Sequence, residues 1–153
     1  MTAHVYMPAS VQADMEHHAR TSYPQECCGL LIGTNTESDM FRITRIQHSK
    51  NVTQGDPKQT FEIDPALLIR TLKELRNTRE DLIGYYHSHP DGPAHPSETD
   101  RASVLEAGKI WLIMAAPSET DQIETKGFVT IGEALPLAFR PVQLMIGAHL
   151  NEQ

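Results

Sequence analysis

Two histidines one residue apart, followed by an aspartate, have the types and spacing of a metal site. His87 and His89 are followed after seven residues by Ser97 and then by Asp100. Residues two apart in an extended strand project to the same side, so both imidazoles can reach one ion, and the carboxylate can return to it after a loop. These side chains supply three of the four positions of a tetrahedral zinc. The fourth is where a catalytic zinc holds water and lowers its pKa to about 7.

The same residues also allow a purely structural interpretation. Ser97 and Asp100 have the spacing of a capping box, in which two side chains satisfy N–H groups at the start of a helix. A cap leaves the histidines unexplained, although a lone pair of histidines also occurs on solvated strands. His95 lies in the connecting loop. We expect it to approach a substrate and not to bind the metal.

Together with an upstream segment, these residues resemble the JAMM (MPN+) metallopeptidases. The signature of that family is a Glu, then His-(Ser/Thr)-His, seven residues, Ser, two residues and Asp. The upstream member is Glu26 in YPQECCGLLIG, and IGYYHSHPDGPAHPSETDR is especially similar to the small prokaryotic members. The resemblance extends from about Val5 to Val142. One departure is Tyr85, where many relatives carry a Trp before the following Tyr. This difference concerns only the local packing.

The resemblance implies a role for each residue of the signature. His87, His89 and Asp100 bind one Zn²⁺, whose bound water is the nucleophile. Glu26 is the general base that acts on this water, and Ser97 stabilises the oxyanion. These residue types suit the hydrolysis of an amide by a zinc hydroxide. Without the resemblance, a solvated loop carboxylate is the favoured interpretation of Glu26.

The resemblance also implies a fold and a class of substrate. The fold is α+β, a sandwich-like, cytidine-deaminase-like single MPN/JAMM domain over residues 1–153, with a core at about 5–142 and a mixed, curved sheet flanked by helices. The substrates are conjugates at the C-terminal glycine of ubiquitin-like or sulfur-carrier proteins, including adducts that release cysteine. The choice between a cysteine adduct and a lysine isopeptide depends on the loops at 51–59 and 90–96, which shape the groove.

Composition excludes several other classes of protein. The 153 residues, 39% of them apolar, suit one globular domain. A net charge of −7 without a basic cluster argues against nucleic acid or an anionic membrane as partner. No apolar run approaches the roughly 18 residues of a membrane span, and no secretory leader is recognisable, so we expect a cytoplasmic protein. The adjacent Cys27 and Cys28 fit a reducing compartment, because a disulfide between neighbours is strained.

The hydrophobic pattern predicts alternating helices and strands. A helix from Pro8 to about Arg20 has one buried face, formed by Val11, Met15 and Ala19. A second helix starts at Asp64-Pro65, continues through Leu68, Leu72 and Leu75, and ends near residue 77; a third runs from Ser97 to about residue 107. We expect strands at residues 28–32, 41–46, 60–63, 81–87, 110–116, 122–131 and 139–144. Pro136 and Pro141 favour loop or edge positions.

Three other functions remain to be weighed. A non-catalytic MPN-type interaction module is the main alternative, since relatives without the ligands serve as scaffolds. A zinc-dependent deaminase requires H-x-E and P-C-x-x-C motifs, and neither occurs. A metal-storage or sensor protein requires ligands that fill the coordination sphere. The oligomeric state and the physiological substrate do not follow from the sequence.

Overall fold

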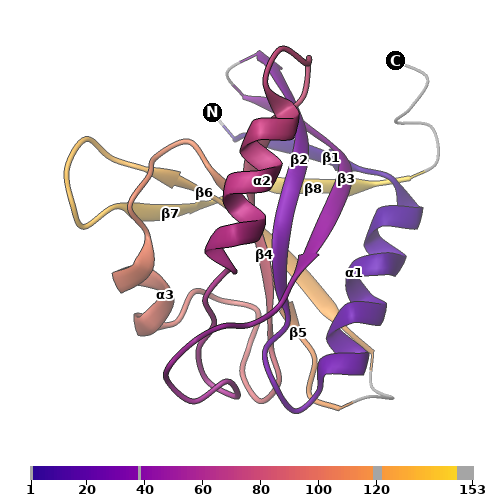
Figure 1. Ribbon diagram of the computed structural model, residues 1–153, viewed down its shortest axis with the longest axis vertical. Coiled ribbons are helices and arrows are strands. Elements are labelled where there is room, and N and C mark those ends of the chain that lie inside the picture. The colour runs from indigo at the N-terminus through magenta and orange to yellow at the C-terminus, as the bar shows by residue number, and fades with distance from the viewer. Residues whose placement is uncertain (1, 38, 119–121, 148–153) are drawn as a thin grey trace.

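One eight-stranded sheet contains all the strands of the chain that the structure describes (Figure 1). This computed structural model describes residues 2–37, 39–118 and 122–147. The helices are α1 (Ala9–Ser22), α2 (Pro65–Leu75) and α3 (Glu98–Ser103). The strands are β1 (His4–Met7), β2 (Cys28–Glu37), β3 (Met40–Ser49), β4 (Asp81–His89), β5 (Ile110–Ala115), β6 (Glu124–Ile131), β7 (Ala138–Pro141) and β8 (Gln143–Ile146).

The strand that carries both histidines lies inside the sheet. The strand order is β7-β6-β5-β4-β2-β3-β1-β8, and β4 pairs antiparallel with β2 and parallel with β5. His87 is paired with Cys28 on β2 and with Ile113 on β5, and His89 is paired with Ala115. Because β4 has a neighbour on each side, the backbone that presents the two histidines is held in place.

Helices cover both faces of the sheet. Leu31 of β2 belongs to the same hydrophobic cluster as Met15 of α1. Leu30 and Ile32 instead pack in a cluster with Leu67 of α2. Successive side chains of a strand point to opposite faces, so α1 and α2 lie on opposite sides of the sheet. This arrangement confirms the predicted mixed sheet flanked by helices. No helix in the described ranges is long and apolar enough to span a bilayer.

The predicted helix starts are confirmed, and α2 buries only part of the apolar pattern from which it was predicted. Asp64 caps α2 by accepting a hydrogen bond from the N–H of Ala66 at 3.0 Å. Leu72 is 45% exposed. The buried residues of α2 are Leu67, Thr71 and Leu75.

Two other boundaries differ from the predictions. Residues 60–63 form no strand; a single isolated bridge joins Ile63 to Asn51. Their apolar side chains reflect contacts with β4, since Phe61 stacks on His87. The third helix ends at Ser103 and not near residue 107. Val104 leaves the helix and is buried in a cluster with Trp111.

The predicted strand at 139–144 is two strands on opposite edges of the sheet. β7 pairs with β6, β8 pairs with β1, and only Val142 separates them. The N–H of Val142 donates to Gly127 at 3.0 Å, and the N–H of Gln143 donates to Ala3 at 2.9 Å. The sheet therefore curves until its two edges approach each other. Pro141 lies in an edge strand, as predicted, whereas the short β1 was not predicted.

The close approach of β4 to β5 requires a glycine. A Cβ atom at Gly84 would lie 1.9 Å from the carbonyl oxygen of Ile110. We expect Gly84→Ala to lower the free energy of unfolding by about 2–4 kcal/mol, because the two strands must separate to admit a methyl group. Urea titration of the variant measures this loss.

Gly147→Ala is the matched control, since no atom lies within 4 Å of a Cβ atom at that position. We expect it to change the stability by less than about 0.5 kcal/mol. Equal effects of the two substitutions would contradict the steric explanation.

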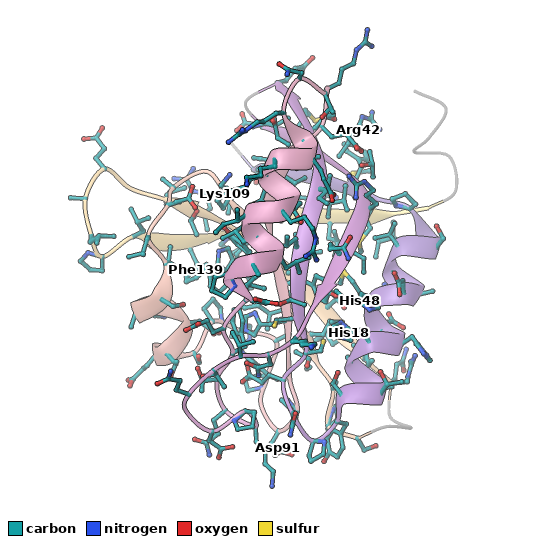
Figure 2. The ribbon with its side chains drawn as sticks, viewed as in Figure 1. His18, Arg42, His48, Asp91, Lys109 and Phe139 are labelled. Carbon is teal, nitrogen blue, oxygen red and sulfur yellow. The ribbon has the colours of Figure 1, made fainter. Side chains whose placement is uncertain are left out.

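A buried tyrosine joins α1 to β4. Tyr86 is fully buried, and its hydroxyl lies 2.7 Å from Nδ1 of His18. The ring of His18 stacks on that of His48 with centroids 4.0 Å apart, and Figure 2 shows the two rings side by side. The pKa of His18 is lowered to about 4, chiefly by burial. The charges of His48 and His17 also lower the pKa, and that of Asp14 raises it.

The lowered pKa of His18 predicts a dependence of stability on pH. The unfolded chain binds a proton at His18 near pH 6.5, whereas the folded chain resists it until about pH 4. The contribution of His18 to stability is therefore complete above pH 6.5 and is lost as the pH falls towards 4. We expect His18→Asn to reduce the fall in unfolding free energy between pH 7 and pH 5. Equal falls in the wild type and in His18→Asn would contradict this explanation.

Candidate metal centre

The structure brings the two histidines and Asp100 together. The Nε2 atoms of His87 and His89 lie 3.0 Å apart, and each lies 3.1 Å from Oδ2 of Asp100. All three residues are buried. The two imidazoles share one side of β4, as the spacing predicts, and the loop at 90–96 returns the chain to them.

The helix cap is part of the same arrangement. The N–H of Ser97 donates to Oδ2 of Asp100 at 2.9 Å, and the N–H of Asp100 donates to Oγ of Ser97 at 3.0 Å. The predicted capping box is thus present, and it fixes the carboxylate that contacts the histidines. The structural and functional interpretations of this segment are therefore compatible.

The two histidines are oriented by different contacts. Nδ1 of His89 donates to the carbonyl of Pro93 at 2.8 Å, which leaves Nε2 of the neutral ring without a proton. Nδ1 of His87 is buried and has no hydrogen-bond partner in the described chain. Its ring is stacked against Phe61, with centroids 4.3 Å apart, and meets Trp111 edge-on at 5.7 Å. Aromatic packing thus replaces a hydrogen bond at His87.

Sequence reasoning missed the role of Phe61. The residue lies in a segment whose apolar character was attributed to a strand. An aromatic residue directly after the loop at 51–59 was the only hint in the sequence. The sequence does not show that this residue contacts His87.

Glu26 lies next to the histidines and is tied to the loop at 51–60. Its N–H donates to the carbonyl of Pro57 at 2.8 Å, and its own carbonyl accepts from Nδ2 of Asn51 at 3.2 Å. Its Oε1 atom is buried without a hydrogen-bond partner among the described residues. A ligand atom of Glu26 and one of each histidine lie within 4.8 Å of one another. Glu26 is therefore not a solvated loop carboxylate.

Burial and hydrogen bonding set the protonation of these groups. Burial raises the pKa of Glu26 to about 8, with His89 opposing the rise and Asp100 adding to it. Burial lowers the pKa of His87, against its hydrogen bond to Asp100. Burial also works to lower the pKa of His89, but the hydrogen bonds to Asp100 and Pro93 outweigh it and the pKa is raised. Burial works to raise the pKa of Asp100, but hydrogen bonds with both histidines hold it well below its usual range.

These residues fit a metal ion. Ligand atoms 2.0–2.1 Å from a tetrahedral ion lie roughly 3.3 Å from one another. The three atoms here are 3.0 and 3.1 Å apart, so a small adjustment admits an ion between them. An unprotonated carboxylate and neutral imidazoles are the states that bind metals. The unpartnered Oε1 of Glu26 adds a further buried acceptor beside the possible metal site.

A cavity opens beside the centre. It has a volume of about 430 Å³ and is lined by Glu26, by Asp56, Lys58 and Gln59, and by residues 89–93 and 95–97. The loops predicted to shape the groove thus meet in one cavity. His95 lies on its wall, as expected for a residue that approaches a substrate, and does not join the three convergent atoms.

Known proteins resemble the chain over much of its length. A protein named desampylase, from Haloferax volcanii, is 34% identical over 90 residues, which cover 59% of this chain and 62% of that protein. A CysO-cysteine peptidase from Mycobacterium tuberculosis is 26% identical over 102 residues, covering 66% of each. The chain thus matches less than two thirds of the length of either relative.

A solved structure and a protein family extend this comparison. The solution structure of a protein from Desulfitobacterium hafniense superimposes with a TM-score of 0.78 at 25% identity, covering 93% of this chain and 92% of the other. The family described as prokaryotic homologues of the JAB domain matches residues 8–127, and this range contains every residue of the candidate centre. The chain therefore belongs to the prokaryotic JAB-domain family.

Proposed function

We propose that this protein is a zinc-dependent metallopeptidase of the isopeptidase type. It hydrolyses the amide bond at the C-terminal glycine of a ubiquitin-like or sulfur-carrier protein. The observation that carries the proposal is the convergence of His87, His89 and Asp100 beside the buried, unpartnered carboxylate of Glu26. The name CysO-cysteine peptidase of one relative supports the class of substrate.

His87, His89 and Asp100 are the proposed zinc ligands, and Glu26 stays outside the coordination sphere. The three ligand atoms are within 3.1 Å of one another, whereas the group that includes Glu26 is spread over as much as 4.8 Å. The chemistry that Zn²⁺ supplies when bound is that of a Lewis acid, which acidifies water and polarises a carbonyl group.

Glu26 is the proposed general base. A water molecule adds to the carbonyl carbon of the glycine, and the proton that it loses passes to the carboxylate of Glu26. The C–N bond then breaks and the same proton moves to the leaving amine, so that the products are a glycine carboxylic acid, which loses its remaining proton to solvent, and a free amine. Burial raises the pKa of Glu26, which brings this carboxylate nearer to the working pH, where a base works best.

Ser97 is the proposed donor to the oxyanion. Its Oγ atom accepts a hydrogen bond from the N–H of Asp100, which leaves its own O–H free to donate. The residue lines the same cavity as Glu26 and His89. A hydroxyl held in this way stabilises the negative oxygen of the tetrahedral intermediate.

A second cavity suits the tail of the carrier protein. It has a volume of about 470 Å³ and begins at Phe61 and Trp111, which contact His87. Its other walls include Leu68, Tyr85 and Val104. Phe61 and Trp111 lie between this cavity and His87, so a largely apolar pocket adjoins the centre and can receive side chains of an extended tail.

We place this activity in the cytoplasm. Cys27 and Cys28 are both buried and unpaired. Burial raises the pKa of each thiol to about 12, so neither is a reactive thiolate near neutral pH. Two packed thiols suit a reducing compartment.

Isosteric substitutions test the assignment. We expect Glu26→Gln to keep one zinc per chain and to lower the rate of cysteine release from a carrier with a C-terminal cysteine by 10²-fold or more, because it removes the base alone. We expect Asp100→Asn to lose the zinc. Elemental analysis measures the metal, and the intact mass of the carrier measures cleavage.

Loss of zinc in Glu26→Gln would identify Glu26 as a ligand and contradict its role as the base. Zinc binding without cleavage of any conjugate by the wild type would favour the non-catalytic interaction module.

Phe61 should influence metal affinity. Nδ1 of His87 has no hydrogen bond to the described residues, so the stacked ring of Phe61 is the contact that orients this proposed ligand. Removing that ring lets the imidazole rotate. Residues that orient ligands typically contribute 10- to 100-fold to metal affinity. We expect Phe61→Leu to weaken zinc binding about tenfold in competition with a chelator, and Phe61→Tyr to retain it. Equal affinities of the two variants would show that stacking does not orient His87.

A further inference from the structure

We propose that Lys58 recognises the free carboxylate of a single amino acid that leaves the carrier. The substrates are then adducts between a carrier and an amino acid, in preference to isopeptides of a lysine side chain. This inference rests on the proposed function, because it specifies which amine the same centre releases.

The backbone beside Lys58 is bonded directly to the proposed base. The carbonyl of Pro57, the preceding residue, accepts the N–H of Glu26 at 2.8 Å. Nδ2 of Asn51 donates both to the carbonyl of Glu26 at 3.2 Å and to that of Thr60 at 3.0 Å. Both backbone polar groups of Glu26 are thus bonded to one loop, which fixes the position of Lys58 relative to the base.

A tight turn fixes the conformation of this loop. Oδ1 of Asp56 accepts the N–H of Lys58 at 3.0 Å. The carbonyl of Asp56 accepts the N–H groups of Gln59 at 2.9 Å and of Thr60 at 3.0 Å. The Asp56 carboxylate is therefore engaged with the backbone, and the turn holds the Cα atom of Lys58 at the wall of the cavity.

Lys58 is the only fixed positive charge among the described residues that line this cavity. The same wall contains Glu26, His89 and Ser97. Lys58 is exposed, and its ammonium forms no ion pair with any described residue within 4.0 Å. Outside the centre, the cavity is lined by two carboxylate residues, Asp56 and Asp91. Asp91 is exposed and lies in the loop at the lower end of the molecule in Figure 2. An ammonium without a partner is available to a substrate.

The position of the leaving amine determines what Lys58 meets. Glu26 must reach the amine nitrogen in order to protonate it. In an amino acid adduct, the carbon that bears this nitrogen also bears the carboxylate, so the negative charge enters the cavity beside the base. In a lysine isopeptide, the nitrogen is followed by four methylene groups and no carboxylate is near. A lysine beside the base therefore favours the first kind of substrate.

The experiment compares three substrates built on one carrier that ends in Gly-Gly. The first has a C-terminal cysteine with a free carboxylate, the second has the corresponding cysteine carboxamide, and the third has a lysine isopeptide. Each is incubated with zinc-loaded wild type, Lys58→Met and Lys58→Glu, and kcat/KM is measured. Lys73→Met, at an exposed position on α2, controls for the loss of one positive charge elsewhere.

We expect the wild type to prefer the free carboxylate over the carboxamide by about fivefold, the upper end for one exposed ion pair. Lys58→Met should lower kcat/KM about fivefold for the carboxylate substrate alone and so remove the preference. Lys58→Glu should reverse the preference, and Lys73→Met should retain it. Because the carboxamide has the same scissile bond, its unchanged rate shows that the chemistry is intact.

Equal rates on carboxylate and carboxamide with the wild type would overturn the role of Lys58 and leave the proposed peptidase function intact. Faster cleavage of the lysine isopeptide than of both cysteine substrates would also overturn it. If no conjugate is cleaved by a wild type that holds zinc, the proposed function itself fails, and this inference fails with it.

Discussion

The candidate centre depends on a single oxygen atom. Oδ2 of Asp100 lies 3.1 Å from each of two imidazole nitrogens and accepts the N–H of Ser97 at 2.9 Å. A buried carboxylate is costly unless its charge is compensated, and here the N–H of Ser97 together with protonated imidazoles or a bound cation supplies the compensation. The position of this oxygen is in turn determined by the capping box of α3. A very short helix therefore contributes to the site chiefly through its first turn.

The surroundings of this centre are divided by polarity. Phe61 and Trp111 exclude water from one side of His87, whose Nδ1 has no hydrogen-bond partner in the part of the chain that the structure describes. The side next to Glu26 and Ser97 opens into a cavity whose lining includes charged side chains, among them Asp56, Lys58 and Asp91. The Glu26 carboxyl is buried at the edge of this cavity, and burial is the largest cause of its raised pKa. The apolar side strengthens electrostatic interactions, and the polar side admits water and the leaving amine.

The sequence predicted the parts of the site that rest on local geometry. The two-residue spacing of His87 and His89 and the cap at Ser97 depend only on strand and helix periodicity. Glu26 is different, because its proximity to the histidines follows from the pairing of β2 with β4 and from the loop at 51–60, which are distant in sequence. Only the resemblance to a family selected it. No local signal identified Phe61 or the loop contacts at Pro57.

The same distinction applies to the fold. Most elements were predicted within a few residues, since buried faces leave a periodic pattern. The pattern at 139–144 continues across Val142 without a break, although the strands on either side belong to opposite edges. Pairing partners, not periodicity, decide such a case. The predicted strand at 60–63 failed for a related reason, because apolar side chains that contact β4 look the same as those of a strand.

The alternation of side chains along β4 makes its register decisive for the chemistry. Tyr86 and Ser88 point towards α1 and the segment at Cys27, while the residues between and after them point to the site. A slip of β4 by one position would present a phenol and an alcohol where the imidazoles now lie, and would place both imidazoles under α1. Gly29, opposite Tyr86, leaves no room for a side chain larger than hydrogen against that ring, since a Cβ atom would lie 2.2 Å from it. The packing of the Tyr86 ring against Gly29 thus favours one register of β4. This register presents the candidate metal ligands His87 and His89 to the site.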